Sequence, residues 1–80
     1  MFAKIFESEI HGQLLVKIDS GDDGPEVRTF FQPKNLGVCS LAVGFKDTDS
    51  GWDSAEELFS RVSCSDAEGT VAIAKKQLGI

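Results

Sequence analysis

The chain is poor in the residues that usually build metal and redox centres. Its 80 residues include two cysteines, Cys39 and Cys64, and one histidine, His11. The cysteines do not form a C-x-x-C pair, and two thiols with one imidazole cannot complete a four-ligand zinc site without carboxylates. We therefore expect no metal centre and no cofactor, and we expect both cysteines to be free thiols.

Long hydrophobic runs are also missing. No apolar stretch approaches the roughly 20 residues of a membrane span. The N-terminal stretch MFAKIFESEI carries three charged side chains and lacks the apolar region of a secretion signal. These features predict a cytoplasmic protein that has no membrane partner.

Basic residues are scarce. Eight Lys and Arg stand against 13 Asp and Glu, which gives a net charge of -5. Binding to nucleic acid depends on Lys and Arg side chains that neutralise phosphates, and the only basic cluster, Lys75 and Lys76, suits the end of a helix. Direct binding of nucleic acid is therefore not expected.

Catalytic motifs are absent too. The sequence contains no nucleophile elbow and no glycine-rich phosphate loop, and 80 residues are enough for one domain with a modest core. We expect a single domain over residues 1–80 that is not an enzyme. A domain of this size is marginally stable alone, which favours a binding role or a homodimer.

The first half of the chain has the pattern of β-strands. The strand-like segments are residues 2–10, 13–19, 26–32 and 38–46. Between the first two, His11 and Gly12 predict a tight hairpin, because such turns need a residue that tolerates positive φ. The fourth segment is apolar on nearly every side chain, which predicts a central position in the sheet.

The second half has the period of α-helices. Residues 54–62 place Ala55, Leu58, Phe59 and Val62 on one helical face, and the next segment does the same with Ala67, Val71, Ala74 and Leu78. Two capping boxes are predicted to start these helices, Ser54 with Glu57 and Ser65 with Glu68. Gly79 is expected to end the second helix.

Four strands followed by two helices predict an α+β domain, a four-stranded antiparallel sheet with two C-terminal helices packed on one face. Two short helices cover only one face of such a sheet. We expect the uncovered face to hold some of Phe2, Phe6, Leu15 and Phe30, and to be exposed or to mediate a homodimer.

Residues 45–59, FKDTDSGWDSAEELF, contain the densest group of acids and the only tryptophan. An EF-hand loop needs Gly at position 6 and Glu at position 12, and neither register that starts at Asp47 or Asp49 supplies them. A looser calcium site from Asp47, Asp49 and Asp53 remains as an alternative. The simplest interpretation is a turn that leads into a helix, whose first turn favours negative charge.

This segment is also the best candidate for a binding surface. The candidate partner-binding residues are Asp47, Asp49, Trp52, Asp53, Glu56 and Glu57. Five neighbouring acids repel one another, and a basic surface on a partner protein would relieve this repulsion. Trp52 is expected either to pack the helix onto the sheet or to anchor an interface.

The leading hypothesis is a small, acidic, non-enzymatic protein-interaction module that binds and modulates a larger protein. The alternative is a DNA mimic that inhibits a nucleic-acid-binding protein, and lesser alternatives are a calcium-binding domain and a small hydrolase with a Cys–His pair. A compact acidic domain without catalytic apparatus is similar in type to the small accessory proteins that phages and other mobile elements carry. This similarity rests on no individual residue.

Overall fold

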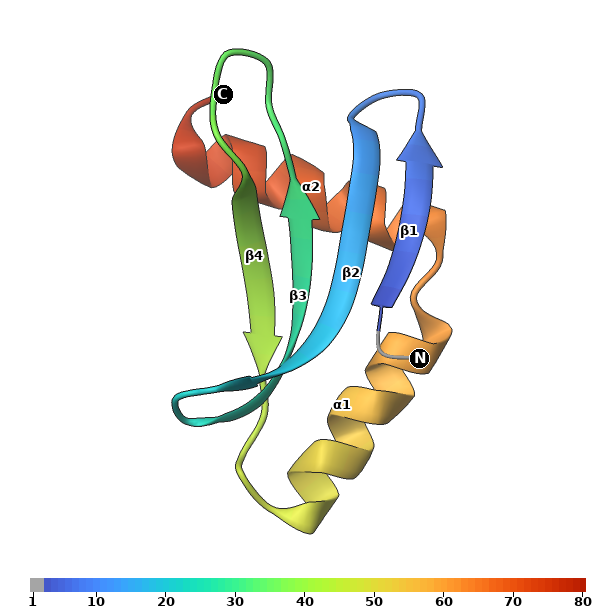
Figure 1. Ribbon diagram of the computed structural model, residues 1–80, viewed down its shortest axis with the longest axis vertical. Helices are drawn as coiled ribbons and strands as arrows, with labels where there is room; N and C mark the ends of the chain where they lie inside the picture. The colour runs from blue at the N-terminus through green and yellow to red at the C-terminus, as the bar shows by residue number, and fades with distance from the viewer. Residues whose placement is uncertain (1–2) are drawn as a thin grey trace.

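The computed structural model describes residues 3–80, which form one sheet and two helices (Figure 1). The elements in chain order are β1 (Ala3–Ser8), β2 (Gly12–Gly21), β3 (Gly24–Phe31), β4 (Cys39–Gly44), α1 (Asp49–Arg61) and α2 (Cys64–Leu78). The strands pair antiparallel in the order β1-β2-β3-β4. The α+β architecture predicted from the sequence is confirmed.

Both helices cover the same face of the sheet, and the core lies between these two layers. The two-residue alternation of the strands directs Leu14, Val16 and Ile18 of β2 and Val27 and Phe31 of β3 into the core. The helices contribute Ala55, Phe59, Ala67, Val71 and Ala74. Of the helical stripes predicted from the sequence, these five residues are buried, Leu58 and Val62 are partly buried against the core, and Leu78 is exposed.

The hairpin between β1 and β2 forms where it was predicted. Ser8 pairs with Gly12, and Gly12 has a φ of +80°, which glycine adopts at little cost. The Ser8 hydroxyl accepts hydrogen bonds from the backbone N–H groups of Ile10 and His11, at 3.2 and 3.0 Å. These two bonds stabilise a loop of three residues, one more than the expected two-residue turn contains.

The uncovered face of the sheet carries Ile5, Leu15 and Phe30 in one cross-strand row. Leu15 and Phe30 lie there as predicted, and Ile5 is 64% exposed. Phe6 lies on the opposite face, because it pairs with Leu14 and residues directly opposite each other share a face. Phe6 therefore packs against the core. Phe2 lies outside the described residues.

Both predicted helix starts are wrong. Helix α1 begins five residues before Ser54, with Thr48 as its N-cap. Helix α2 has Ser63 as its N-cap and a capping box formed with Asp66, in place of the predicted Ser65 and Glu68. Gly79 ends α2 with a φ of 76°, as predicted.

The position predicted for the fourth strand is also wrong. The strand β4 pairs with β3 alone, so it forms one edge of the sheet, and β1 forms the other.

In β1, the side chain of Lys4 points toward the helices. Its Nζ donates hydrogen bonds of 2.7, 3.0 and 3.3 Å to the carbonyl oxygens of Phe59, Ser60 and Val62 at the end of α1. A cation is favourable at that end of a helix, so Lys4 fastens α1 to β1.

Candidate interaction surface

The acids of α1 lie on the side of the helix opposite to the core. The buried side carries Gly51, Ala55 and Phe59. Asp49, Asp53 and Glu57 each lie two positions before one of these buried residues. Two positions correspond to about 200° around a helix with 3.6 residues per turn. Glu56 joins them, and Asp47 lies just before the N-cap. We call these five exposed residues the acidic face: Asp47, Asp49, Asp53, Glu56 and Glu57.

Most of the acidic face has no basic partner. In residues 3–80, its one ion pair joins Glu57 Oε1 to Arg61 Nε at 3.8 Å, and both side chains are mostly exposed. An exposed pair at this spacing contributes only about 0.3–0.5 kcal/mol. The other four carboxylates have no Lys or Arg nitrogen of these residues within 4.0 Å. A concentrated negative potential therefore remains on this side of α1.

Trp52 borders the acidic face and is half-buried. Its indole Nε1–H donates a hydrogen bond of 3.2 Å to Asp47 Oδ1, which holds the ring beside the chain that enters the helix. Trp52 belongs to α1, whereas the helix predicted from the sequence began after it, at Ser54. The structure thus brings all six predicted partner-binding residues together on one helix and the residue before its N-cap.

A close backbone contact fixes where α1 begins. The Thr48 hydroxyl accepts a hydrogen bond of 3.0 Å from the N–H of Gly51. Gly51 lies against the backbone of Lys46, and a Cβ at Gly51 would overlap the Lys46 carbonyl oxygen. The sequence predicted that Gly51 supplies an unusual φ in a turn, but Gly51 is not among the glycines with positive φ. This glycine is needed because the chain passes so close to the helix that there is no room for a side chain.

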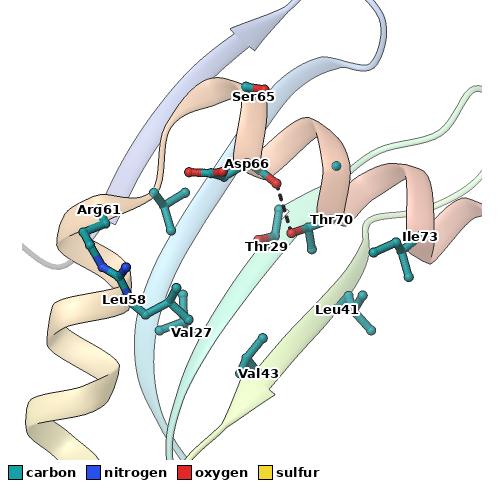
Figure 2. A pocket seen from close by; sticks show the side chains of 12 residues that line it. Val27, Thr29, Leu41, Val43, Leu58, Arg61, Ser65, Asp66, Thr70 and Ile73 are labelled. Carbon is teal, nitrogen blue, oxygen red and sulfur yellow. Dashed lines mark hydrogen bonds between the residues drawn. The ribbon is translucent and has the colours of Figure 1, made fainter.

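A groove that sequence reasoning missed lies between the two helices, above β3 and β4 (Figure 2). Its volume is about 480 Å³, and its apolar walls include Val27, Leu41, Val43, Leu58 and Ile73. Arg61 and Asp66 also line it. The groove exists because α1 and α2 diverge. The angle between the two helices cannot be predicted from a local sequence pattern.

The two thiols and the imidazole occur in separate contacts. The Cys39 thiol lies 3.5 Å from the carbonyl oxygen of Gly37, and the Cys64 thiol lies 3.9 Å from that of Glu7. Neither thiol is hydrogen-bonded to His11 within the described chain, and both cysteines are free. Within residues 3–80, no group of three or more His, Cys, Asp or Glu side chains is placed to hold a metal ion.

Two carboxyl groups have a shifted pKa, and both lie outside the acidic face. The pKa of Asp66 is lowered by hydrogen bonds from the Ser63 backbone N–H, at 3.0 Å, and from the Ser63 hydroxyl. The pKa of Asp19 is lowered by the backbone N–H of Ser20 and by Lys17. Both pKa shifts have local causes: the cap of α2 for Asp66 and a contact near the end of β2 for Asp19.

No helix in the described part of the chain is long and apolar enough to cross a bilayer. No protein-family model, no curated protein and no solved structure matches the chain.

Proposed function

We propose that this protein is a non-enzymatic protein-interaction module, and that its acidic face binds a partner protein with a basic surface. The observation that carries the proposal is the row of carboxylates on the outer side of α1, four of which lack a basic partner within residues 3–80. Their mutual repulsion falls when a basic surface approaches, and such complementarity also speeds the encounter.

Trp52 is the proposed anchor of this interface. Aromatic side chains dominate the binding free energy of many interfaces, and they work best at the border between apolar contact and surrounding polar groups. The bond from the indole to Asp47 restricts the ring before the partner arrives, so little side-chain entropy is lost on binding. The acids would steer the partner, and Trp52 would supply most of the buried contact.

The proposal also includes the cellular location and the type of protein. Two free cysteines suit a reducing cytoplasm, and a small acidic domain suits an accessory protein that modulates a larger host protein. The DNA-mimic alternative uses the same acids but a different target, a protein that normally binds nucleic acid. It predicts binding that weakens steeply with salt and competition by duplex DNA.

The proposal is tested by affinity capture from a host lysate with quantitative mass spectrometry. The acidic face is neutralised in one variant, which carries Asp49→Asn, Asp53→Asn, Glu56→Gln and Glu57→Gln. The matched control carries Glu7→Gln and Glu9→Gln at the β1–β2 hairpin, where both side chains are exposed. We expect basic proteins to be captured by the wild type and the control, and to be lost with the neutralised variant.

The affinity of a captured partner then separates the hypotheses. We expect Trp52→Ala to weaken binding more than Asp49→Asn, because the anchor is desolvated and the acid is not. The reverse order would contradict the role of Trp52. Equal capture by the wild type and the neutralised variant would refute the proposal, and displacement of the partner by DNA would favour the mimic. A rise in melting temperature with millimolar Ca²⁺ would instead support the calcium alternative.

A further inference from the structure

The edge strand β4 lacks the features that usually protect an edge. Natural sheets protect such strands with charged side chains, with proline or with a covering element, because unpaired backbone groups attract another strand. The opposite edge, β1, carries Lys4 and Glu7 and directs Lys4 inward onto α1. The strand β4, CSLAVG, has neither a charged residue nor a proline.

The hydrogen-bond pattern shows which backbone groups of β4 point outward. The N–H of Phe45 donates to the carbonyl oxygen of Pro25 at 2.9 Å. Hydrogen-bonded pairs alternate along an antiparallel ladder, so Val43, Leu41 and Cys39 direct their backbone groups to β3. The N–H and C=O groups of the small residues between and after them, Ser40, Ala42 and Gly44, therefore face the open edge. No backbone group in residues 3–80 is hydrogen-bonded to that edge.

The last turn of α2 extends past the sheet at this same edge. In Figure 1, α2 crosses the sheet from β1 to β4, and its C-terminal turn projects beyond β4. Ala67, Val71 and Ala74 are buried, but Leu78, on the same helical stripe and in this last turn, is 55% exposed. From Ala74 to Leu78 the helix rises about 6 Å, and a neighbouring strand would lie about 4.8 Å from β4. One more strand would cover Leu78.

The charges at the two ends of β4 have opposite sign. At its last residue, Gly44, the strand adjoins Asp22 and Asp23 of the β2–β3 turn, which line the same hollow as Gly44 and Phe45. At its first residue it lies on the side where α2 ends (Figure 1), with Lys75 and Lys76 in the last turn. An antiparallel second copy of β4 places the basic end of each copy against the acidic end of the other.

We propose that β4 pairs with β4 of a second copy of this chain, antiparallel and centred on Ala42, so that the two sheets join into one of eight strands. In this register Leu41 of one copy lies opposite Val43 of the other, and Ser40 lies opposite Gly44. Every pair from Cys39 to Phe45 is uncharged. The pairing covers Val43, which is 50% exposed in the single chain, and it places the second copy's strand beneath Leu78.

Sedimentation velocity over protein concentrations from about 10 µM to 1 mM tests this interface. We expect the wild type to shift with concentration from 8.6 kDa to twice that mass. The variant Ala42→Glu brings two carboxylates face to face at the twofold axis, and we expect it to raise the dissociation constant at least tenfold. Within each copy the new Glu lies opposite Arg28, a favourable cross-strand pair, so the fold should be retained.

The matched control is Ile5→Glu, which places the same charge on the uncovered face at the opposite edge of the sheet. It should leave the dimer unchanged. A wild type that stays monomeric at 1 mM, or an Ala42→Glu variant that still dimerises, refutes the proposal. Loss of the dimer with Ile5→Glu alone would assign self-association to the uncovered sheet face instead.

Amide hydrogen exchange of the wild type gives a second test that needs no variant. The N–H groups of Ser40, Ala42 and Gly44 should exchange more slowly as the protein concentration rises, because each becomes hydrogen-bonded to the second copy. Exchange at these three residues that stays fast at every concentration refutes the pairing. The variants of the acidic face leave β4 unaltered, so failure of one proposal is distinguishable from failure of the other.

Discussion

Gly51 offers the sharpest test of how α1 is positioned. Replacing a helical glycine by alanine normally stabilises a protein by about 0.5–1 kcal/mol, because alanine loses less conformational entropy on folding. Gly51 is in the first turn of α1 and is buried against Lys46, where an added Cβ would overlap the Lys46 carbonyl oxygen and lie 2.9 Å from its carbon. We therefore expect Gly51→Ala to be destabilising.

The size of the effect follows from what has to move. The atoms in the way belong to the backbone, so the chain entering α1 must shift, and overpacking of this kind costs about 1–3 kcal/mol. Subtracting the gain of about 0.5–1 kcal/mol in helix propensity leaves a net loss of about 1 kcal/mol at the middle of both ranges, and about 2.5 kcal/mol at most. In a domain of this size 1 kcal/mol corresponds to about 4–8 °C in melting temperature.

Gly69 in α2 is the matched control, because nothing lies within 4 Å of a Cβ built there. Urea denaturation followed by circular dichroism should show Gly69→Ala more stable than the wild type and Gly51→Ala less stable. If both substitutions stabilised the protein equally, the contact between Gly51 and Lys46 would not exist as described, and the proposed position of the acidic face would be wrong with it.

Two further predictions concern the helix caps. Thr48→Ala removes the N-cap of α1 and should reduce the free energy of unfolding by about 1 kcal/mol. Ser54→Ala lies inside the helix and should be neutral or slightly stabilising. If urea denaturation showed the larger loss for Ser54→Ala, Ser54 would be the N-cap, as the sequence predicted. The pKa of Asp66 is lowered from its ordinary value of 3.8, so its ionised form contributes stability that is present above this value and is lost as the pH falls through the lower pKa of the folded state. Urea midpoints between pH 6 and pH 2.5 should therefore fall less for Asp66→Asn than for the wild type, and an equal fall would show that this carboxylate contributes no pH dependence.

The helix faces could be predicted from the sequence, but the helix starts could not. The spacing of Ala55 with Phe59 depends on one helix alone, so it survives whatever the neighbouring elements do. The start of α1 depends on a choice between two hydroxyl residues that can both cap, Thr48 and Ser54. The structure selects Thr48, whose hydroxyl caps the helix, and places Gly51 against the backbone of Lys46.

In the candidate site too, the residues could be predicted from the sequence but their arrangement could not. The residues of the acidic face were found from composition, but their arrangement requires knowing that α1 begins at Asp49. With a start near Ser54, Asp49 and Asp53 would belong to a turn. With the observed start they continue the row of Glu56 and Glu57. The groove of Figure 2 could not be predicted at all, because it depends on the angle between two helices.

The strand β4 is the most informative failure of the sequence-based prediction. Its apolar composition on both faces is typical of a strand with neighbours on either side, yet within the described chain it has one neighbour, β3. Leu78 shows the same discrepancy, since its position on the α2 stripe predicts burial and the structure leaves it 55% exposed. A second copy of β4 at the open edge would make the strand central and cover Leu78 at once. The proposed pairing would account for both mismatches at this edge.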